Sequence, residues 1–245
     1  MPSSRSRRAE LERLGAQPFA HRGLHGPGRP ENSRAAFRAA IEAGSGMELD
    51  VQASRDGAAI VFHDYDLDRL TATQGRVADL DAHALTALRL CGISETIPLL
   101  ADVLDLIGGR APLLIEVKSP NRHVVPLCRA VAAALGDYPG PVGVMSFNPE
   151  VGAWFARHTP ERLRGLVVTE SGKKNVRGRV ERRLSFWRAQ ADFLAYDIRD
   201  LPSAFAAGKR AAGVPVYTWT VRTAADRARA AAEADQIIYE DVPGG

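Results

Sequence analysis

The sequence predicts an α/β fold, a distorted (β/α)₈ barrel (TIM barrel). Three observations lead to this prediction. Short apolar strands alternate with amphipathic helical segments along 245 residues, a length typical of such barrels. Eight strands are expected when the return strand of one hairpin (58–62) is set aside, and polar residues follow the carboxyl ends of several of them, where barrels carry catalytic groups. A doubly wound open sheet is the alternative, but no Gly-x-Gly-x-x-Gly sequence follows the first strand.

The composition is that of an ordinary globular protein. Hydrophobic residues make up 45% of the chain and charged residues 25%, and the formal net charge is only +3. We attribute the excess of arginine over lysine to coding composition and expect no nucleic-acid partner. No apolar run is long enough for a membrane span, and no secretory signal is apparent. Cys91 and Cys128 match no metal-binding spacing, so we expect buried thiols in a reducing cytoplasm.

The chain opens with a βαβ unit. We expect residues 1–16 to be a mobile N-terminal arm and residues 17–245 to form a single barrel domain. Residues 17–20 form the first strand in this interpretation, and a loop rich in glycine and proline leads from it to a helix that Gly44 can end.

Residues 46–63 predict a β-hairpin. Asp56 and Gly57 are the strongest short hairpin signal in the chain, and an apolar run follows them. Pairing outwards from this turn places His63 nearly opposite Asp50. A group of carboxylates and a titratable base would then share one small volume.

A small capping insertion is expected at about residues 65–96, because this span is polar and too irregular for a core strand. Alternation of strands and helices resumes after it. The remaining strands are expected at 113–118, 142–146, 163–168, 192–197, 214–220 and 236–239. A helix is expected over 100–107, ended by Gly108 and Gly109, and further helices are expected at 123–135, 149–157, 176–190, 201–212 and 223–234.

Carboxylates on two strands indicate a metal site. Glu48 and Asp50 lie two residues apart, so both point to one face of their strand and repel each other unless a cation lies between them. Oxygen ligands of this kind suit Mg²⁺ or Ca²⁺. Glu116 and Lys118 share a face of a later strand in the same way. A solvated face and a mutual Glu116–Lys118 ion pair are the alternatives, but three carboxylates from two strands make a better metal cage.

An ordered set of motifs resembles the glycerophosphodiester phosphodiesterase family from residue 19 to residue 243. Each motif is weak alone, but nine or more in this order and spacing are specific. The motifs are His21-Arg22-Gly23, Pro30-Glu31-Asn32, Glu48-Leu49-Asp50-Val51, Arg55-Asp56-Gly57, His63-Asp64, Ile97-Pro98-Leu99, Ile115-Glu116-Val117-Lys118, Ser146-Phe147, Trp219-Thr220-Val221 and Asp241-Val242-Pro243.

The resemblance implies a hydrolase that converts glycerophosphodiesters to sn-glycerol 3-phosphate and an alcohol with one divalent cation, Ca²⁺ or Mg²⁺. The implied site comprises His21 and His63 as the general acid–base pair, Glu48, Asp50 and Glu116 as metal ligands, Arg22 and Lys118 as phosphate contacts, and Glu31 as a possible metal or glycerol contact.

The chemistry of the residues agrees with this reaction, since cations neutralise phosphoryl charge and histidines titrate near neutral pH. We favour His63 as the base and His21 as the acid. The nucleophile is left open between water and the glycerol 2-hydroxyl. Trp219 is expected to line the glycerol pocket or to fill the barrel core. The family's terminal Thr-Asp-Tyr-Pro is replaced by Glu240-Asp241-Val242-Pro243, a departure that affects contacts at that end of the barrel.

The segment 173–188 is rich in arginine, and Val180, Leu184 and Trp187 recur in it at helical spacing. We favour an ordinary barrel helix with an arginine-rich solvent face. The alternative is peripheral contact with anionic lipid, which would accompany a lysophospholipase D acting on lysophospholipids. A barrel that binds a phosphorylated ligand without turnover is a third alternative. Headgroup preference, native metal and oligomeric state are left open.

Overall fold

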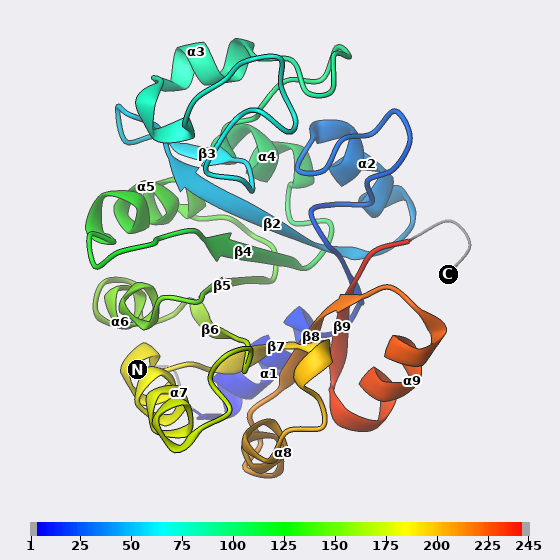
Figure 1. Ribbon diagram of the computed structural model, residues 1–245, viewed down its shortest axis with the longest axis vertical. Helices are drawn as coiled ribbons and strands as arrows, with labels where there is room; N and C mark the ends of the chain where they lie inside the picture. The colour runs from blue at the N-terminus through cyan, green and yellow to red at the C-terminus, as the bar shows by residue number, and fades with distance from the viewer. Residues whose placement is uncertain (1–3, 242–245) are drawn as a thin grey trace.

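The computed structural model describes residues 4–241 and contains a closed barrel of eight parallel strands (Figure 1). The strands are β1 (Phe19–Ala20), β2 (Gly46–Ala53), β4 (Leu113–Val117), β5 (Val142–Ser146), β6 (Leu163–Val168), β7 (Phe193–Asp197), β8 (Val216–Val221) and β9 (Gln236–Tyr239). The barrel closes because β1 pairs in parallel with both β2 and β9. The predicted (β/α)₈ barrel is therefore confirmed.

Helices surround the barrel as the alternation predicts (Figure 1). They are α2 (Arg34–Glu42), α4 (Leu100–Ile107), α5 (Val125–Leu135), α6 (Pro149–His158), α7 (Val176–Ala189), α8 (Ala204–Ala211) and α9 (Ala224–Glu233), with a short 3₁₀ turn η2 (Ile198–Asp200) after β7. Local sequence sets their ends. The Ser33 hydroxyl accepts the Ala36 N–H at the start of α2, and α4 ends at Gly108, whose φ of 56° is left-handed.

The predicted hairpin is present, formed by β2 and the antiparallel β3 (Ala59–Val61). Val51 pairs with Val61, and the Phe62 N–H donates to the Asp50 carbonyl at 3.0 Å. Phe62 therefore faces Asp50, and His63 follows one residue later at the end of the strand, beside the barrel mouth.

The insertion after the hairpin forms a cap with its own small hydrophobic core. It contains η1 (Val77–Asp79) and α3 (Ala82–Ala87), and it lies above β3 at the top of Figure 1. The buried residues of this core come from the hairpin and from the insertion: Ile60, Phe62, Leu67, Leu70, Val77, Leu85, Leu90 and Ile97. Packing of this core holds the cap against the strand that ends at His63.

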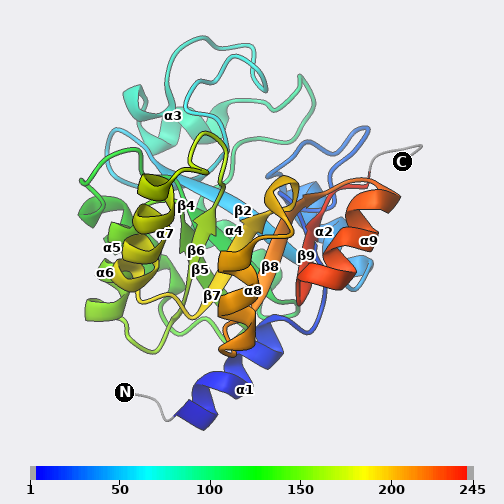
Figure 2. The same cartoon turned by 60° about the horizontal axis from the view of Figure 1, so that its bottom comes forward.

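The amino end of the barrel is closed by helix α1 (Ser4–Leu14), which corrects the prediction of a mobile arm at residues 1–16 (Figure 2). Leu14 is fully buried in the barrel interior with Phe193. Arg7 donates through Nε to Asp192 Oδ1 at 2.9 Å and through Nη1 to the Glu161 carbonyl at 2.6 Å. The arm was misjudged because its charged sequence hides these long-range partners. Residues 1–3 lie outside the described region.

Glycines make room for the aromatic layer in the barrel interior. A Cβ at Gly165 would lie 2.3 Å from the Phe193 ring, and a Cβ at Gly143 would lie 2.9 Å from it. No side chain other than hydrogen fits at these strand positions, so Phe193 can fill the centre below the site. The structure also corrects one cysteine prediction, since Cys128 is buried but Cys91 is exposed.

Candidate active site

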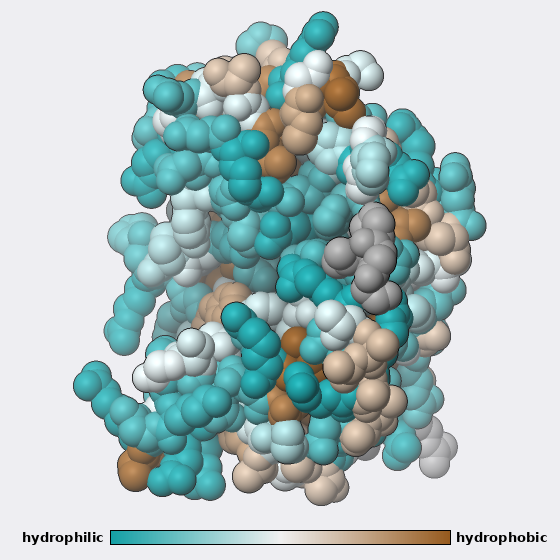
Figure 3. All heavy atoms as spheres, turned by 45° about the vertical axis from the view of Figure 1, so that its right-hand side comes forward, coloured by the Kyte–Doolittle hydropathy of each residue, from teal (hydrophilic) through white to brown (hydrophobic). Residues whose placement is uncertain are grey.

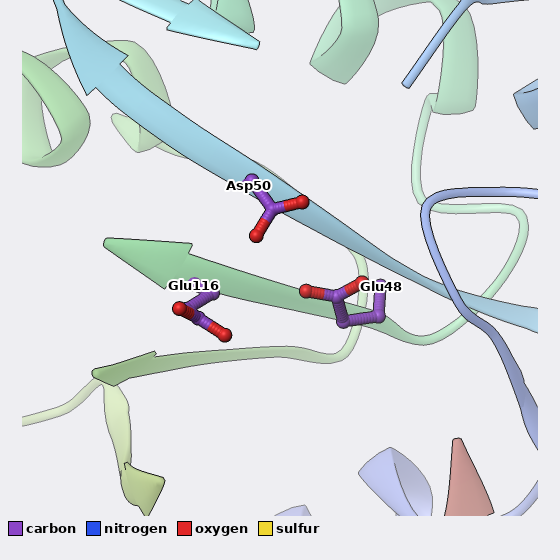
Figure 4. Close-up of side chains that lie close together, drawn as sticks. All are labelled: Glu48, Asp50 and Glu116. Atoms are coloured by element: carbon purple, nitrogen blue, oxygen red, sulfur yellow. The ribbon is translucent and has the colours of Figure 1, made fainter. Parts of the chain in front are cut away.

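Three carboxylates converge at the carboxyl ends of β2 and β4 (Figure 4). Glu48 and Asp50 extend from β2, and Glu116 extends from β4 directly beside Asp50 in the strand register. One oxygen of each lies within 4.8 Å of one oxygen of the others, and all three residues are buried. Among residues 4–241, this is the one group of acidic, histidine or cysteine side chains with such geometry.

The protonation preferences of the three carboxyls differ. Burial, together with the charges of Asp50 and Glu116, raises the pKa of Glu48 well above its usual value, and burial also raises the pKa of Glu116. Burial opposes ionisation of Asp50 too, but Lys118, His63 and Arg22 lower its pKa to about 2. The cluster lacks positive charge chiefly at Glu48. A buried set of oxygen ligands with this deficit fits a hard divalent cation.

Lys118 lies between two of the carboxylates. Its Nζ is 3.0 Å from Asp50 Oδ1 and 2.9 Å from Glu116 Oε1, and the two charges raise the pKa of Lys118 although burial opposes this. The mutual ion pair considered from the sequence is therefore present, and it coexists with the carboxylate cluster instead of replacing it.

Arg22 contacts the cluster through its backbone and its side chain. Its φ of 56° is left-handed, which is uncommon for a residue with a side chain, and its N–H donates to Glu48 Oε2 at 3.0 Å. Its Nε lies 3.4 Å from Asp50 Oδ2 and has no hydrogen-bond partner among the described residues. Asn32 supports the arrangement by donating from Nδ2 to Asp50 Oδ2 at 3.0 Å.

Glu31 lies outside the carboxylate cluster and bridges two arginines. Its Oε1 accepts from Arg22 Nη1 at 2.7 Å and from Arg69 Nη2 at 2.7 Å, and these guanidinium groups lower the pKa of Glu31 against the effect of burial. Arg69 belongs to the cap and also donates from Nε to Asp64 at 2.5 Å. Glu31 is thus engaged in fixing Arg22 and in fastening the cap to the barrel mouth.

His21 follows β1 and is held by a carboxylate from the far end of the chain. Its Nδ1 lies 2.6 Å from Glu240 Oε1, whereas its Nε2 lies 3.9 Å from Glu48 Oε2. Arg222 donates to both oxygens of Glu240, from Nε at 2.7 Å and from Nη2 at 3.0 Å. Together His21 and Arg222 lower the pKa of Glu240 to about 2, despite its burial. Because a carboxylate only accepts, His21 carries its proton on Nδ1 when neutral.

His63 has an equivalent partner on the opposite side of the site. Its Nδ1 lies 2.7 Å from Asp64 Oδ1, so its Nε2 is also the nitrogen left without a proton in the neutral ring. Gln52 fixes the strand end by donating from Nε2 to the carbonyls of Phe62 and Asp64, at 2.9 and 2.6 Å. Burial is the main cause that lowers the pKa of both His63 and His21.

A cavity of about 440 Å³ joins these residues with the strands on the far side of the barrel. Trp219 lines it, with its ring packed edge-on against Phe147 at 5.6 Å and its Nε1 donating to the Ala195 carbonyl at 2.9 Å. The cavity opens into a groove of about 910 Å³ beneath the cap, and His63, Glu116, Lys118 and Phe147 line both. Figure 3 shows hydrophilic side chains around the hollow below the cap.

The structure brings all of the predicted site residues except Glu31 to the lining of this cavity: His21, Arg22, Glu48, Asp50, His63, Glu116, Lys118 and Trp219. Sequence reasoning missed Asn32, Arg69 and Glu240. Asn32 was visible in the Pro-Glu-Asn motif, and Glu240 was visible as a charged residue directly after the last strand. Arg69 carried no signal of its own.

A family model described as the glycerophosphoryl diester phosphodiesterase family matches residues 21–243, nearly the whole chain. The chain belongs to this family. The match includes Val242 and Pro243 of the terminal motif, which lie outside the described residues.

Individual members of the glycerophosphoryl diester phosphodiesterase family align with parts of the chain. A glycerophosphodiester phosphodiesterase of Caldanaerobacter subterraneus is 42% identical over 111 residues, which are 41% of this chain and 44% of that relative. One of Bacillus altitudinis is 38% identical over 113 residues, again 44% of the relative. Glycerophosphodiester phosphodiesterase 1 of Bos taurus is 28% identical over 212 residues, 81% of this chain and 62% of the relative. The aligned stretches thus span less than half of the first two relatives.

Solved structures share the fold. An Oleispira antarctica phosphodiesterase, determined with the product sn-glycerol-3-phosphate, superposes with a TM-score of 0.79 at 23% identity over 91% of this chain and 92% of that chain. A glycerophosphodiester phosphodiesterase of Thermotoga maritima gives a TM-score of 0.73 at 23% identity, over 90% and 92%. Both likenesses support the distorted barrel.

Proposed function

We propose that this protein is a metal-dependent phosphodiesterase that hydrolyses glycerophosphodiesters, such as glycerophosphocholine or glycerophosphoethanolamine, to sn-glycerol 3-phosphate and an alcohol. The observation that carries the proposal is the placement of two histidines around one carboxylate cluster. His21 and His63 each have Nδ1 bound to a carboxylate, which leaves both Nε2 atoms available to a ligand in the same cavity. Family membership agrees with this reaction class.

Glu48, Asp50 and Glu116 would hold one divalent cation, Ca²⁺ or Mg²⁺, which when bound supplies positive charge that stabilises the phosphoryl oxygens. Hard cations of this kind match the all-oxygen donor set. Lys118 and Arg22 add positive charge at the same edge of the cavity. We assign both to the phosphate, because the partnerless Nε of Arg22 and the ammonium of Lys118 are donors that an anionic oxygen can accept from.

The histidines divide the proton transfers. As a phosphorus–oxygen bond forms to the nucleophile, the Nε2 lone pair of His63 takes the nucleophile's proton. As the bond to the alcohol breaks, His21 gives a proton to the departing oxygen. His21 suits the acid role because the Glu240 carboxylate at 2.6 Å favours its protonated form, although burial and Arg22 lower its pKa. Burial, Lys118 and Arg22 favour the neutral form of His63, and they outweigh Asp50 and Asp64 in their effect on its pKa.

The other wall of the cavity suits the glycerol group. Trp219 and Phe147 offer apolar ring surface there, and we assign Trp219 to the glycerol carbons. The nucleophile is water or the glycerol 2-hydroxyl. Detection of a cyclic glycerol phosphate during single turnover would identify the hydroxyl.

The test is an assay of purified protein on glycerophosphocholine with coupled detection of glycerol 3-phosphate, in EDTA, Mg²⁺ or Ca²⁺. We expect product only with metal, and a loss of about 10²- to 10⁴-fold in His63→Ala. His83→Ala is the matched control, because His83 is exposed on α3 and lies outside the cavity. Absence of product with either metal, across several headgroups, would refute the proposal.

Lysophospholipids form the alternative substrate class, since a lysophospholipase D would use the same reacting groups. The large apolar residues exposed on α7 lie on the outer wall and do not line the cavity, so they offer no surface for an acyl chain next to the reacting groups. Comparison of lysophosphatidylcholine with glycerophosphocholine separates the two. A cytoplasmic location is also part of the proposal, and the unpaired thiols of Cys91 and Cys128 agree with a reducing compartment.

A further inference from the structure

Helix α7 exposes large apolar side chains to solvent, which is the reverse of what an ordinary barrel helix does. Four apolar side chains point to solvent, at positions i, i+4, i+8 and i+11: Val176, Val180, Leu184 and Trp187. Trp187 is 75% exposed and Leu184 is 60% exposed. Seven large hydrophobic residues are exposed in the part of the chain for which side chains are described, and these four are the only ones that share an element. They form a contiguous apolar stripe along the outside of the barrel.

The opposite face of α7 carries the contacts to the barrel, through small and polar residues and through the partly buried Phe186. Gly178, Arg182 and Ala189 are its buried residues, offset by two positions from the apolar stripe and hence by about 200° around the helix. A Cβ at Gly178 would lie 2.0 Å from the Lys173 carbonyl oxygen, which shows how closely the preceding loop packs. The apolar residues are therefore not the core-facing set that their spacing alone would suggest.

Buried polar contacts hold α7 in this orientation. Arg182 donates from Nη1 to the Lys173 carbonyl at 2.9 Å and pairs through Nη2 with Glu170 at 3.1 Å. Glu170 in turn accepts from the Tyr196 hydroxyl at 2.5 Å and from Ser203 at 2.6 Å. Because the helix is formed and fixed on the barrel wall, presenting its stripe to a partner requires no folding of the segment.

Unpaired cations border the apolar stripe on both sides. Arg179 and Arg183 lie along one edge and Arg177 along the other, by helical position, and all three are exposed. None of them has an ion-pair partner among the described residues, whereas Lys173, Lys174 and Arg188 on the same segment pair with Glu181, Asp200 and Glu150. A strip of apolar side chains between unneutralised guanidinium groups matches the surface of an anionic bilayer, where the apolar groups enter the interface and the cations meet phosphate groups.

We propose that helix α7 docks the protein onto anionic membrane surfaces, with Val176, Val180, Leu184 and Trp187 inserted between lipid headgroups. A second copy of this chain is the competing occupant of the stripe. A twofold contact through the stripes would place the unpaired arginines of both copies against each other, and like charges across an interface disfavour association. Helix α7 stands on the outer wall between α6 and α8 (Figures 1 and 2), so a planar surface can approach it.

Vesicle binding by the full chain tests this proposal. We expect co-sedimentation with vesicles of equal parts phosphatidylglycerol and phosphatidylcholine, little with phosphatidylcholine alone, and release by high salt. The fluorescence of Trp187 should shift to shorter wavelength as the indole enters the interface, and Trp187→Phe should abolish that shift. Absence of co-sedimentation with the anionic vesicles at low salt would overturn the proposal.

Replacement of the unpaired α7 arginines tests whether vesicle binding depends on this helix or only on the overall positive charge of the protein. Each cation near an anionic leaflet strengthens binding about fivefold, so replacing Arg177, Arg179 and Arg183 by Gln should weaken vesicle binding about one-hundred-fold. The matched control replaces three other exposed arginines that have no ion-pair partner among the described residues, on α2, on α5 and in the cap: Arg38, Arg129 and Arg89. Equal loss of binding in both triple variants would refute a role for α7.

The apolar contribution is tested with Leu184→Ser and Trp187→Ser together. We expect about tenfold weaker binding or more, with unchanged hydrolysis of glycerophosphocholine, since neither residue lines the catalytic cavity. Size-exclusion chromatography with light scattering completes the test. A dimer that this variant dissociates would identify the stripe as an interface between copies and would overturn the membrane proposal.

Discussion

The two walls of the catalytic cavity differ in how their charges are balanced. On the wall formed by β2 and β4 (the unbalanced wall), Lys118 pairs with Asp50 and Glu116, and Arg22, which also pairs with Glu31, lies 3.4 Å from Asp50. Glu48 has no lysine or arginine side chain within ion-pair distance among the described residues. On the wall formed by β7, β8 and β9, each carboxylate has an arginine of its own. Arg199 donates to Asp197 at 2.6 Å, and Arg222 donates to Glu240 at 2.7 Å.

Under the proposed function, this difference suits the two walls to different ligands. A wall that lacks positive charge stabilises a bound cation and, through it, an anionic group. A wall whose charges are already paired has little net charge to attract an ion, and it suits the neutral hydroxyls and carbons of glycerol. His21 lies where the two walls meet, because its Nε2 faces Glu48 and its Nδ1 contacts Glu240.

The largest effect on activity is expected when one of the proposed metal ligands on the wall formed by β2 and β4 loses its charge. Asp50→Asn should lower kcat by about 10³-fold or more and weaken metal binding measured by calorimetry, because the amide keeps the shape but removes the charge. Asp105→Asn is the matched control, since Asp105 is exposed on α4 away from the cavity. Retention of metal binding in Asp50→Asn would contradict the assignment of this wall.

Glu240 should affect the rate of catalysis by orienting His21 and should have little effect on substrate affinity. Glu240→Gln is expected to lower kcat by about 10- to 100-fold with little change in KM, because the bond that orients the imidazole loses its charge. Glu240→Asp should recover part of the rate if orientation is the cause. A rise in KM alone would show that Glu240 instead contacts the substrate. Nitrogen NMR of His21 should report a shifted balance of ring tautomers in Glu240→Gln.

Substitution of Trp219 tests the assignment of the glycerol group to the wall formed by β7, β8 and β9. Trp219→Phe keeps an aromatic ring but loses the hydrogen bond from Nε1 to the Ala195 carbonyl. We expect KM to rise by about two- to fivefold for every glycerophosphodiester, independent of headgroup. A loss that depends on the headgroup would place the alcohol, and not the glycerol, against this wall.

The smallest expected effect is on stability, which substitution of a buried cluster residue should raise instead of lower. In EDTA, Glu48→Gln should raise Tm by about 2–4 °C, because it removes a carboxyl that on folding must either bury its charge or take up a proton, while the amide carbonyl still accepts the Arg22 N–H. With Mg²⁺ or Ca²⁺ the wild-type protein should be the more stable one. Equal Tm values for the two proteins in EDTA would argue against repulsion within the cluster.

The pH dependence of the stability of the metal-free protein also follows from Glu48. Burial raises the pKa of Glu48 in the folded protein, so between its ordinary value and that raised value the folded chain holds a proton that the unfolded chain has released. The metal-free wild type should therefore gain stability as pH falls through this window. Glu48→Gln should show a smaller gain in a series of melting curves, because Glu116, whose pKa burial also raises, remains in the variant.

The carboxylate cluster on the wall formed by β2 and β4 could be predicted from the sequence, whereas the contacts on the wall formed by β7, β8 and β9 could not, for a physical reason. Glu48 and Asp50 share a face because they are two residues apart on one strand, so their proximity follows from strand geometry alone. His21 and Glu240 are 219 residues apart and meet only because β1 pairs with β9 to close the barrel. Helix α1 escaped prediction similarly, because its partners Glu161 and Asp192 are distant in sequence.

The strand alternation was predictable because each strand is a short apolar run. The orientation of α7 was not, since periodicity gives the spacing of an apolar stripe but not the direction in which it faces. Contacts with residues outside the helix, such as the Arg182–Glu170 ion pair and the packing of Phe186 on the core, fix the stripe toward solvent.

Closure of the barrel by α1 places the two ends of the described chain at opposite ends of the molecule (Figure 2). Ser4 lies at the amino end of the barrel, whereas Asp241 directly follows Glu240 at the mouth. An affinity tag, a fusion partner or a surface linker attached ahead of α1 would leave substrate entry unobstructed. The same attachment after Asp241 would load the segment that orients His21, so the position of the tether can decide whether an immobilised preparation is active.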